Sequence, residues 1–270
     1  MRQFSRRIFF AGSFGFLMGN AYAEGSAPTG QIAFVRGEYG GERAKIWIMD
    51  ADGRNLRPLT NTTEENARED RPAWSPDGQQ IAFSLQRRIA VCGDQGKQLK
   101  ILTPETMDAG DPTWSPDGEW IAFQAWTSGR KECHIHKVRL DGTEIKKLTH
   151  LKGYHWMPCW SPAGNEIIYE SLSKNREIFT IRPDATNVRN LTRNAVTDHA
   201  PACSPDGRQI ALMSGKFGDA EVCVMNVNGY DMKDLTQHPG RDSEPAWSPD
   251  GSWLAFTRSH SNRPMAVSYT

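Results

Sequence analysis

The sequence predicts an all-β fold, a six-bladed β-propeller made of four-stranded blades. The main observation is a Trp-Ser-Pro-Asp-Gly motif in five copies, which begin at Trp74, Trp114, Trp160, Cys203 and Trp247. The third copy has Ala in place of Asp, and the fourth has Cys in place of Trp. The steps between copies are 40, 46, 43 and 44 residues, and a period near this value is typical of propeller blades. One blade cannot bury both faces of its sheet alone, so neighbouring blades are expected to stack.

Each motif has the features of a tight turn that leads into a buried strand. Proline pre-sets the backbone of the turn, and Asp and Gly supply side-chain capping and a positive φ. An apolar triplet follows each motif, and one more precedes the first copy: Ile32–Phe34, Ile81–Phe83, Ile121–Phe123, Ile167–Tyr169, Ile210–Leu212 and Leu254–Phe256. These triplets predict six blades. The motif tryptophans are large and apolar, so we expect them to be buried between blades.

The segments between the motifs complete each blade. A second apolar strand, a turn and a strand ending in Leu-Thr follow most triplets, and a Pro-Ala-Trp-like strand precedes each motif turn. The first unit lacks a clear Pro-Ala-Trp-like strand, and the final unit stops at Thr270 after its second apolar strand. We therefore expect the first and last blades to be incomplete. Residues 24–29 are poorly suited to replace a missing strand, because Gly and Pro disfavour strands.

Residues 1–23 are predicted to be a signal peptide, and residues 24–270 a single propeller domain. Arg2, Arg6 and Arg7 form a basic start, residues 8–18 are apolar, and Ala21–Ala23 fits a small-x-small cleavage site. The arginine pair also fits a twin-arginine export signal, and the general secretory route stays an equal alternative. Either route predicts a periplasmic or secreted protein that does not span the membrane after signal removal.

Composition excludes some classes of partner. Lys plus Arg and Asp plus Glu number 32 each, a balance that gives no electrostatic footprint for nucleic acid. The five cysteines cannot all pair within one chain, and their spacing suggests no disulfide framework, although export would permit disulfides. Cys133, His134 and His136 allow metal ligation, but His136 aligns with Trp47 and Phe179 of other blades, which favours a packing role.

The turn motifs resemble those of the TolB family of six-bladed propellers, whose WD-like repeats carry Ser-Pro-Asp-Gly turns, and the similarity covers residues 31–270. This resemblance implies an exported, non-enzymatic scaffold in the cell envelope. The best-known member belongs to the Tol–Pal system, binds the peptidoglycan-associated lipoprotein and carries an additional N-terminal α/β domain. We expect that domain to be absent here, because the signal leads directly into the first blade. Prolyl-oligopeptidase-like enzymes have similar repeats, but this sequence contains no Gly-x-Ser-x-Gly motif.

The segment before each Pro-Ala-Trp-like strand is expected to face the mouth of the central channel, where propellers bind ligands. Its polar and aromatic residues are Glu69, Asp70, Asp111, His155, Trp156, Asp198, His199, Asp242 and Glu244. Six carboxylates around one opening would repel each other, so they would favour a divalent cation such as calcium or the basic side chains of a partner. The alternative is that these residues cap strand ends and remain solvated.

Two functions follow from these observations. The first is a monomeric, non-catalytic scaffold that binds a protein or peptide in the cell envelope. The alternative is a hydrolase or lyase that uses the acidic and histidine residues of the mouth, although no nucleophile with an adjacent base can be assigned. If the mouth binds a cation or a basic peptide, changing Asp198 and Asp242 to Asn is expected to abolish that response and leave the fold intact.

Overall fold

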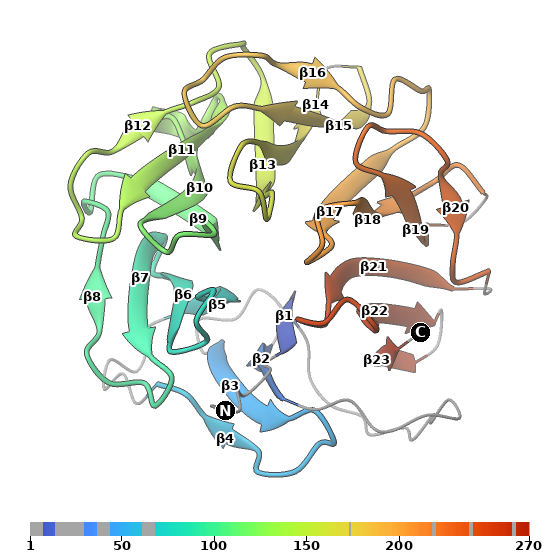
Figure 1. Cartoon of the computed structure of the whole chain (residues 1–270). Coiled ribbons are helices and arrows are strands. Elements are labelled where there is room, and N and C mark those ends of the chain that lie inside the picture. Colours follow the sequence, from blue (N-terminus) through green and yellow to red (C-terminus); the bar gives the residue numbers. More distant parts are fainter. Residues whose placement is uncertain are drawn as a thin grey trace.

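The computed structural model describes residues 8–13, 30–36, 44–60, 68–172, 174–217, 220–237, 240–260 and 263–269. Strands in these ranges form small sheets arranged radially around a central axis (Figure 1), which confirms the all-β propeller. Helical structure in these ranges is limited to a 3-10 turn at Ser128–Arg130. No helix in the described ranges is long and apolar enough to cross a membrane.

The first three blades follow the chain in order. Their strands are β1 (Ile8–Ser13), β2 (Gln31–Arg36), β3 (Lys45–Asp50) and β4 (Arg57–Pro58) in blade 1, β5 (Glu69–Trp74), β6 (Gln80–Leu85), β7 (Arg88–Gly93) and β8 (Lys100–Ile101) in blade 2, and β9 (Asp108–Trp114), β10 (Trp120–Trp126), β11 (Cys133–Arg139) and β12 (Lys146–Lys147) in blade 3. The innermost strand comes first in each blade, and the outermost strand comes last (Figure 1).

Blades 4 to 6 repeat this order. Their strands are β13 (Tyr154–Trp160), β14 (Ile167–Leu172), β15 (Arg176–Ile181) and β16 (Arg189–Asn190), then β17 (Asp198–Cys203), β18 (Gln209–Ser214), β19 (Glu221–Asn226) and β20 (Lys233–Asp234), and finally β21 (Arg241–Trp247), β22 (Leu254–His260) and β23 (Arg263–Tyr269). Blades 3 and 4 are joined by one parallel bridge between Cys133 and Tyr154. Within the described residues blade 6 has three strands, as its sequence predicts.

Blade 1 differs from the sequence-based expectation. Its innermost strand is β1, from the apolar part of the predicted signal peptide, and β1 runs parallel to β2. The innermost strands of the other five blades run antiparallel to their neighbours. Residues 24–29 lie outside the described part of the chain, and removal of residues 1–23 stays a prediction.

The Ser-Pro-Asp-Gly segments form the predicted turns, with the side chains closing them from within. In the first copy, Gln80 N donates to Ser75 Oγ at 2.9 Å and Gln79 N donates to Asp77 Oδ1 at 3.0 Å. Gly78 has φ 67°, a conformation that glycine adopts without strain. The third copy has no Asp, and there Ser161 Oγ donates to Asn165 Oδ1 at 3.1 Å instead. The turn motif is therefore structural.

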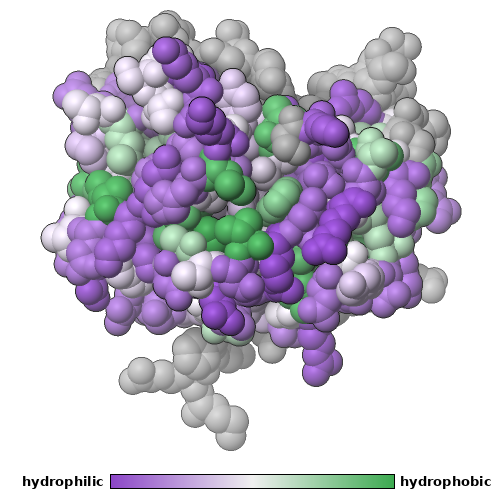
Figure 2. All heavy atoms as spheres, turned by 90° about the horizontal axis from the view of Figure 1, so that it is seen from above, coloured by the Kyte–Doolittle hydropathy of each residue, from purple (hydrophilic) through white to green (hydrophobic). Residues whose placement is uncertain are grey.

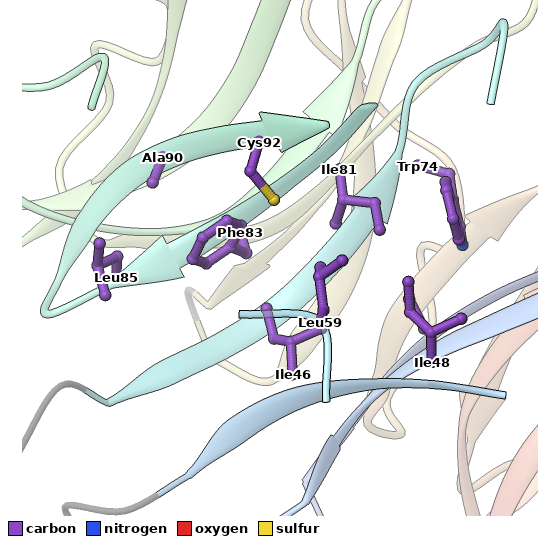
Figure 3. Close-up of a cluster of buried hydrophobic side chains, with 10 residues drawn as sticks. Ile46, Ile48, Leu59, Trp74, Ile81, Phe83, Leu85, Ala90 and Cys92 are labelled. Atoms are coloured by element: carbon purple, nitrogen blue, oxygen red, sulfur yellow. The ribbon is translucent and has the colours of Figure 1, made fainter. Parts of the chain in front are cut away.

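Four blades have a motif tryptophan, and it packs against the preceding blade. Trp74 joins Ile46 and Ile48 of blade 1 in one buried cluster (Figure 3), and Trp114 packs with residues of blade 2 in the same way. Trp74, Trp114 and Trp160 are 3%, 7% and 7% exposed, which confirms their predicted burial. Trp247 is half-buried, so the prediction was wrong for that residue. Its Nε1 still donates to Ala202 O at 3.1 Å.

One side of the outer wall is mostly hydrophilic. In the side view of Figure 2, most residues of the wall are hydrophilic, and the hydrophobic ones form small separate patches. The large exposed hydrophobic residues of the described chain include Leu151, which is 62% exposed, and Tyr230, which is 70% exposed. Single exposed apolar residues of this kind are normal on a soluble surface.

Candidate binding site at the channel mouth

The innermost strands enclose a central cavity of about 690 Å³. Strands β5, β9, β13, β17 and β21 and the turns that follow them line it. Most lining residues are prolines, alanines and the motif tryptophans, because each strand contributes a repeated Pro-x-Trp segment and each turn a further proline. The channel wall is therefore largely apolar.

A bulge in each of these strands turns one residue toward the cavity. The bulged residues have φ between 47° and 54°, and they are Arg71, Asp111, Met157, Ala200 and Glu244. The register of each strand against its neighbour shifts at this point, as expected for a β-bulge. A proline, which has no N–H to donate, follows each bulged residue. All five residues line the cavity.

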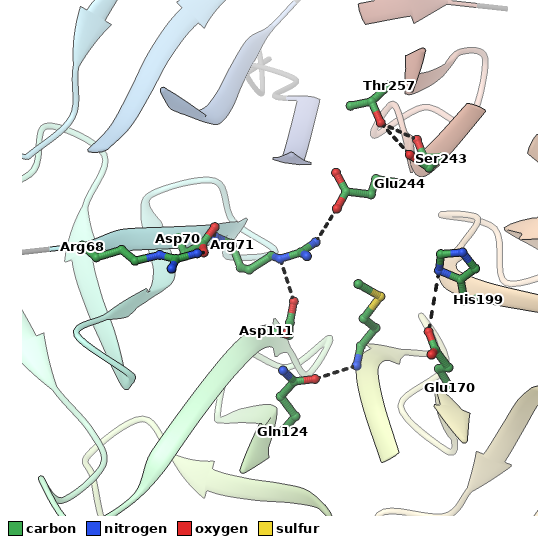
Figure 4. A network of polar contacts seen from close by, with 11 residues as sticks. Arg68, Asp70, Arg71, Asp111, Gln124, Glu170, His199, Ser243, Glu244 and Thr257 are labelled. Atoms are coloured by element: carbon green, nitrogen blue, oxygen red, sulfur yellow. Dashed lines mark hydrogen bonds and ion pairs between the residues drawn. The ribbon is translucent and has the colours of Figure 1, made fainter. Parts of the chain in front are cut away.

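Three of the bulged residues form an ion-pair network across the opening. Arg71 Nε lies 3.1 Å from Asp111 Oδ1, and Arg71 Nη1 lies 2.8 Å from Glu244 Oε1 (Figure 4). The three side chains come from blades 2, 3 and 6, and the Arg71 side chain is 26% exposed. Burial raises the pKa of both Asp111 and Glu244, and the neighbouring Arg71 opposes that rise. Arg71 therefore supplies the positive charge that these two carboxylates need.

The opposite side of the opening is less charged. Met157 and Ala200 occupy the bulges of blades 4 and 5, and Met157 N donates to Gln124 Oε1 at 3.2 Å. Next to them, His199 Nδ1 lies 3.9 Å from Glu170 Oε2 (Figure 4). Glu170 Oε1 accepts a hydrogen bond from Arg176 at 3.0 Å.

The Glu170–His199 pair is shifted toward its neutral forms. Burial raises the pKa of Glu170 to about 7, and Arg176 only partly opposes it. Burial also lowers the pKa of His199 to about 4. Near neutral pH this side of the opening therefore carries less charge than its residue types suggest, and most of the charge lies on the Arg71 side.

The raised pKa of Glu170 predicts a pH-dependent effect of Glu170→Gln. The folded chain holds a proton on this carboxyl between the unfolded pKa, near 4.5, and the folded pKa, near 7. Parental stability therefore falls as pH rises through that window. Glu170→Gln removes this loss, so we expect the variant to exceed the parent by about 2–3 kcal/mol at pH 8 and to match it at pH 4. Urea unfolding at both pH values measures this difference. Glu119→Gln, at an exposed site, is the control, and an equal effect of Glu170→Gln at both pH values would contradict the assignment.

Four of the predicted mouth residues lie elsewhere. Glu69, Asp198 and Asp242 are fully buried, and His155 is nearly so. They occupy equivalent positions in their blades, as comparison of the repeats predicts. Their side chains, however, point into the junction with the preceding blade or toward the adjacent strand. The expectation that they form a solvent-facing ring was therefore wrong.

These buried residues hold strands and blades together. Glu69 Oε2 accepts hydrogen bonds from Ile46 N at 3.0 Å and from Thr60 Oγ1 in blade 1. Asp242 accepts two hydrogen bonds from Arg258, at 2.8 and 2.7 Å. Asn194 Nδ2 donates to Asp198 Oδ2 at 2.6 Å. His155 Nε2 donates to Leu151 O at 3.1 Å. Each of these side chains thus has at least one hydrogen-bond partner, as expected because burying a polar group without a partner is costly.

The Leu-Thr motif takes part in the same construction. The threonine hydroxyl accepts a hydrogen bond from the backbone of the third strand of its blade, as between Ile89 N and Thr103 Oγ1 at 2.9 Å and between Ile135 N and Thr149 Oγ1 at 3.0 Å. In blade 1 the third strand donates this hydrogen bond to a carboxylate, from Ile46 N to Glu69 Oε2. The motif therefore ties the outermost segment to the third strand in blades 2 to 5.

The remaining predicted residues lie around the opening. Asp111, Glu244 and His199 belong to the groups described above, and Asp70 pairs with Arg68 at 2.8 Å (Figure 4). Trp156 is half-buried and stacks on Tyr154, with ring centroids 5.3 Å apart. Sequence reasoning missed Arg71 and Glu170. The signal for Arg71 was its position directly before the proline of the innermost strand.

The described residues contain no group of three or more His, Cys, Asp or Glu placed to hold a metal ion. His136 stacks on Phe123 at 5.7 Å, as its alignment with aromatic residues predicts. A calcium ion in the channel stays a prediction.

The fold and the site together define a propeller with a largely apolar channel and an ion-paired mouth. The chain belongs to the TolB beta propeller domain family, whose model matches residues 26–199 and 158–268, as the motifs indicate.

Known relatives agree with this family. A Protein TolB homolog from Chlorobium luteolum is 30% identical over 196 residues, which cover 73% of this chain and 34% of the relative. The Tol-Pal system protein TolB from Nitratidesulfovibrio vulgaris is 22% identical, with 69% of this chain and 32% of the relative covered. This chain thus spans about a third of the length of these two relatives. The crystal structure of TolB from Acinetobacter baumannii superposes with a TM-score of 0.75 at 23% identity, covering 90% of this chain and 61% of that one.

Proposed function

We propose that this protein is an exported scaffold that binds a protein or peptide at the channel mouth and performs no chemistry. The observation that carries the proposal is the Arg71–Asp111–Glu244 network, held at the end of an apolar cavity by three bulged strands. Every strongly repeated motif has a structural role, so this unrepeated polar group is the best candidate for recognition. The name of the Nitratidesulfovibrio relative, a Tol-Pal system protein, supports an envelope partner and a periplasmic location.

The charges around the opening favour a basic partner. Asp70, Asp111 and Glu244 provide three carboxylates, against the guanidinium groups of Arg68 and Arg71. A lysine or arginine side chain entering the channel competes with Arg71 for Asp111 and Glu244, and the apolar wall receives the rest of the peptide. Partly desolvated charges of this kind contribute to specificity and to the association rate.

An enzymatic role has less support. Glu170 has a pKa suited to acid–base chemistry, but it is fully buried, so a substrate atom cannot contact its carboxyl group. Asp111 and Glu244 are paired with Arg71 and have no adjacent nucleophile among the described residues. The hydrolase or lyase alternative therefore rests on fold similarity alone, and fold does not define function.

The proposal predicts that neutralising the two paired carboxylates reduces binding. Asp111→Asn with Glu244→Gln keeps the size of both side chains and removes the attraction for a basic partner. We expect the main protein captured from an envelope extract by the tagged parent to fall at least about tenfold, or ~1.4 kcal/mol. Quantitative mass spectrometry of the captured proteins measures the change, and circular dichroism checks that the variant is folded.

A matched control separates local from overall charge. Glu119→Gln with Glu144→Gln also removes two negative charges, from outer positions whose side chains are 60% and 45% exposed, and capture should remain at the parental level. Equal capture by both double variants would refute the proposed site. Calcium titration of the melting temperature, in the parent and in the Asp111→Asn, Glu244→Gln variant, tests the alternative of a bound cation.

A further inference from the structure

Two of the five cysteines lie together in the wall of the channel. Cys159 is in β13 of blade 4 and Cys203 is at the end of β17 in blade 5, and both line the central cavity. Cys203 N donates to Cys159 Sγ at 2.9 Å, and Cys203 Sγ lies 3.8 Å from Cys159 O. Both cysteines are partly exposed. They are thus in contact and open to small molecules in the channel.

Comparison of the repeats shows that this pair replaces a contact made at two other junctions. In blades 3 and 6 the motif tryptophan donates a hydrogen bond to the residue directly before the motif of the preceding blade, whereas Trp160 Nε1 donates to Gly164 O at 3.3 Å in its own turn. Trp114 Nε1 donates to Ala73 O at 3.0 Å, and Trp247 Nε1 donates to Ala202 O at 3.1 Å. Cys203 is the single motif copy without tryptophan, and the residue directly before the motif of blade 4 is Cys159. Two coordinated exceptions to the repeat therefore meet at one point.

The other three cysteines have different surroundings. Cys92, Cys133 and Cys223 are each fully buried, in blades 2, 3 and 5, and none lines the cavity. Each is surrounded by apolar side chains or strand backbone, consistent with a packing role. They provide internal controls for the pair.

We propose that Cys159 and Cys203 are a redox-active dithiol that forms a disulfide bond between blades 4 and 5. The link would join strands whose cysteines are 44 residues apart, at the junction that lacks a tryptophan. A cross-link over a loop of this length restricts the unfolded chain and so stabilises the fold. Compartments outside the cytoplasm favour such bonds.

The bond forms by thiol–disulfide exchange with a low-molecular-weight disulfide. The thiolate of one cysteine attacks a sulfur of the donor, forms a mixed disulfide and releases one donor thiolate. The second cysteine attacks the protein sulfur of that mixed disulfide and releases the other donor thiolate. Two protein thiols are oxidised, one donor disulfide is reduced to two thiols, and the two protons pass to the released thiolates. The hydrogen bond to Cys159 and burial raise the pKa of Cys203, so the reaction should accelerate as pH rises.

The test uses the intact chain with glutathione disulfide as the oxidant. Reduced protein is incubated with glutathione disulfide, alkylated with N-ethylmaleimide under denaturing conditions and analysed by mass spectrometry. We expect two of the five cysteines to escape alkylation and the peptide with Cys159 to be linked to the peptide with Cys203. Alkylation of all five, glutathione retained on either cysteine without a link, or a link to another cysteine would overturn the proposal.

Two variants make the result specific. Cys223→Ser should still form the link. Cys159→Ala with Cys203→Trp restores the residues found in other blades, so it should fold and form no link. The melting temperature of the parent should be higher in glutathione disulfide than in dithiothreitol, and this difference should disappear in the Cys159→Ala, Cys203→Trp variant. An equal redox-dependent shift in that variant would overturn the assignment.

Discussion

Replacing Trp114 with alanine is expected to destabilise the propeller by about 3–5 kcal/mol, the range for large aromatic truncations in a core. Trp114 is 7% exposed, belongs to the cluster between blades 2 and 3, and its Nε1 donates to Ala73 O at 3.0 Å. The substitution removes that hydrogen bond and leaves a cavity that rigid neighbouring strands cannot fill. Urea unfolding followed by circular dichroism measures the loss.

Trp120 provides the matched control for this substitution. It is half-buried and lies under the amino group of Lys137, at 4.2 Å from its ring centre. Trp120→Ala should cost about 1 kcal/mol, the usual scale away from the core. Similar losses for Trp114→Ala and Trp120→Ala would show that the motif tryptophans do not hold the blades together.

Replacing Arg258 with methionine is expected to cost about 3–5 kcal/mol, because it leaves the Asp242 carboxylate buried without its partner. Asp242 is fully buried and accepts both hydrogen bonds of the guanidinium group, at 2.8 and 2.7 Å. Asp242→Asn is for the same reason expected to cost stability, since an amide cannot accept both hydrogen bonds of the guanidinium group.

A double variant separates the buried charge from the packing. Arg258→Met with Asp242→Leu replaces the ion pair by apolar groups, and such exchanges are often neutral. We expect this double variant to recover most of the stability lost in Arg258→Met, as measured by urea unfolding. No recovery would mean that the loss in Arg258→Met comes from side-chain shape and not from the unpaired Asp242.

Much of the fold could be predicted because the propeller repeats its local chemistry. The turn motif combines the residues that a tight turn needs, and Ser75 and Asp77 make the expected hydrogen bonds. The period of the repeats gave the blade boundaries. The exchange of Asp for Ala in the third copy did not disturb the turn, because Asn165 replaces the missing acceptor.

The site was harder to predict because neighbouring residues of one strand have opposite fates. Asp242 is sealed at a junction between strands, whereas Glu244, two residues later, faces the cavity beside Arg71. Simple alternation along a strand would place both residues on the same face. The two side chains nevertheless point to different places, because Glu244 lies at the bulge before Pro245, where its φ is 53°. The bulge re-aims its side chain.

The sequence by itself determined the all-β class, the order of the strands, the turns and the family, because these depend on local patterns that recur along the chain. The tertiary structure decided which polar residues are sealed between blades and which meet in the channel. It brought Arg71 beside Glu244, which lies 173 residues away, and Cys159 beside Cys203. The physical reason is that closure of the ring brings Arg71 to Glu244, stacking of neighbouring blades brings Cys159 to Cys203, and the bulges set the side-chain directions, whereas the repeat pattern encodes none of these.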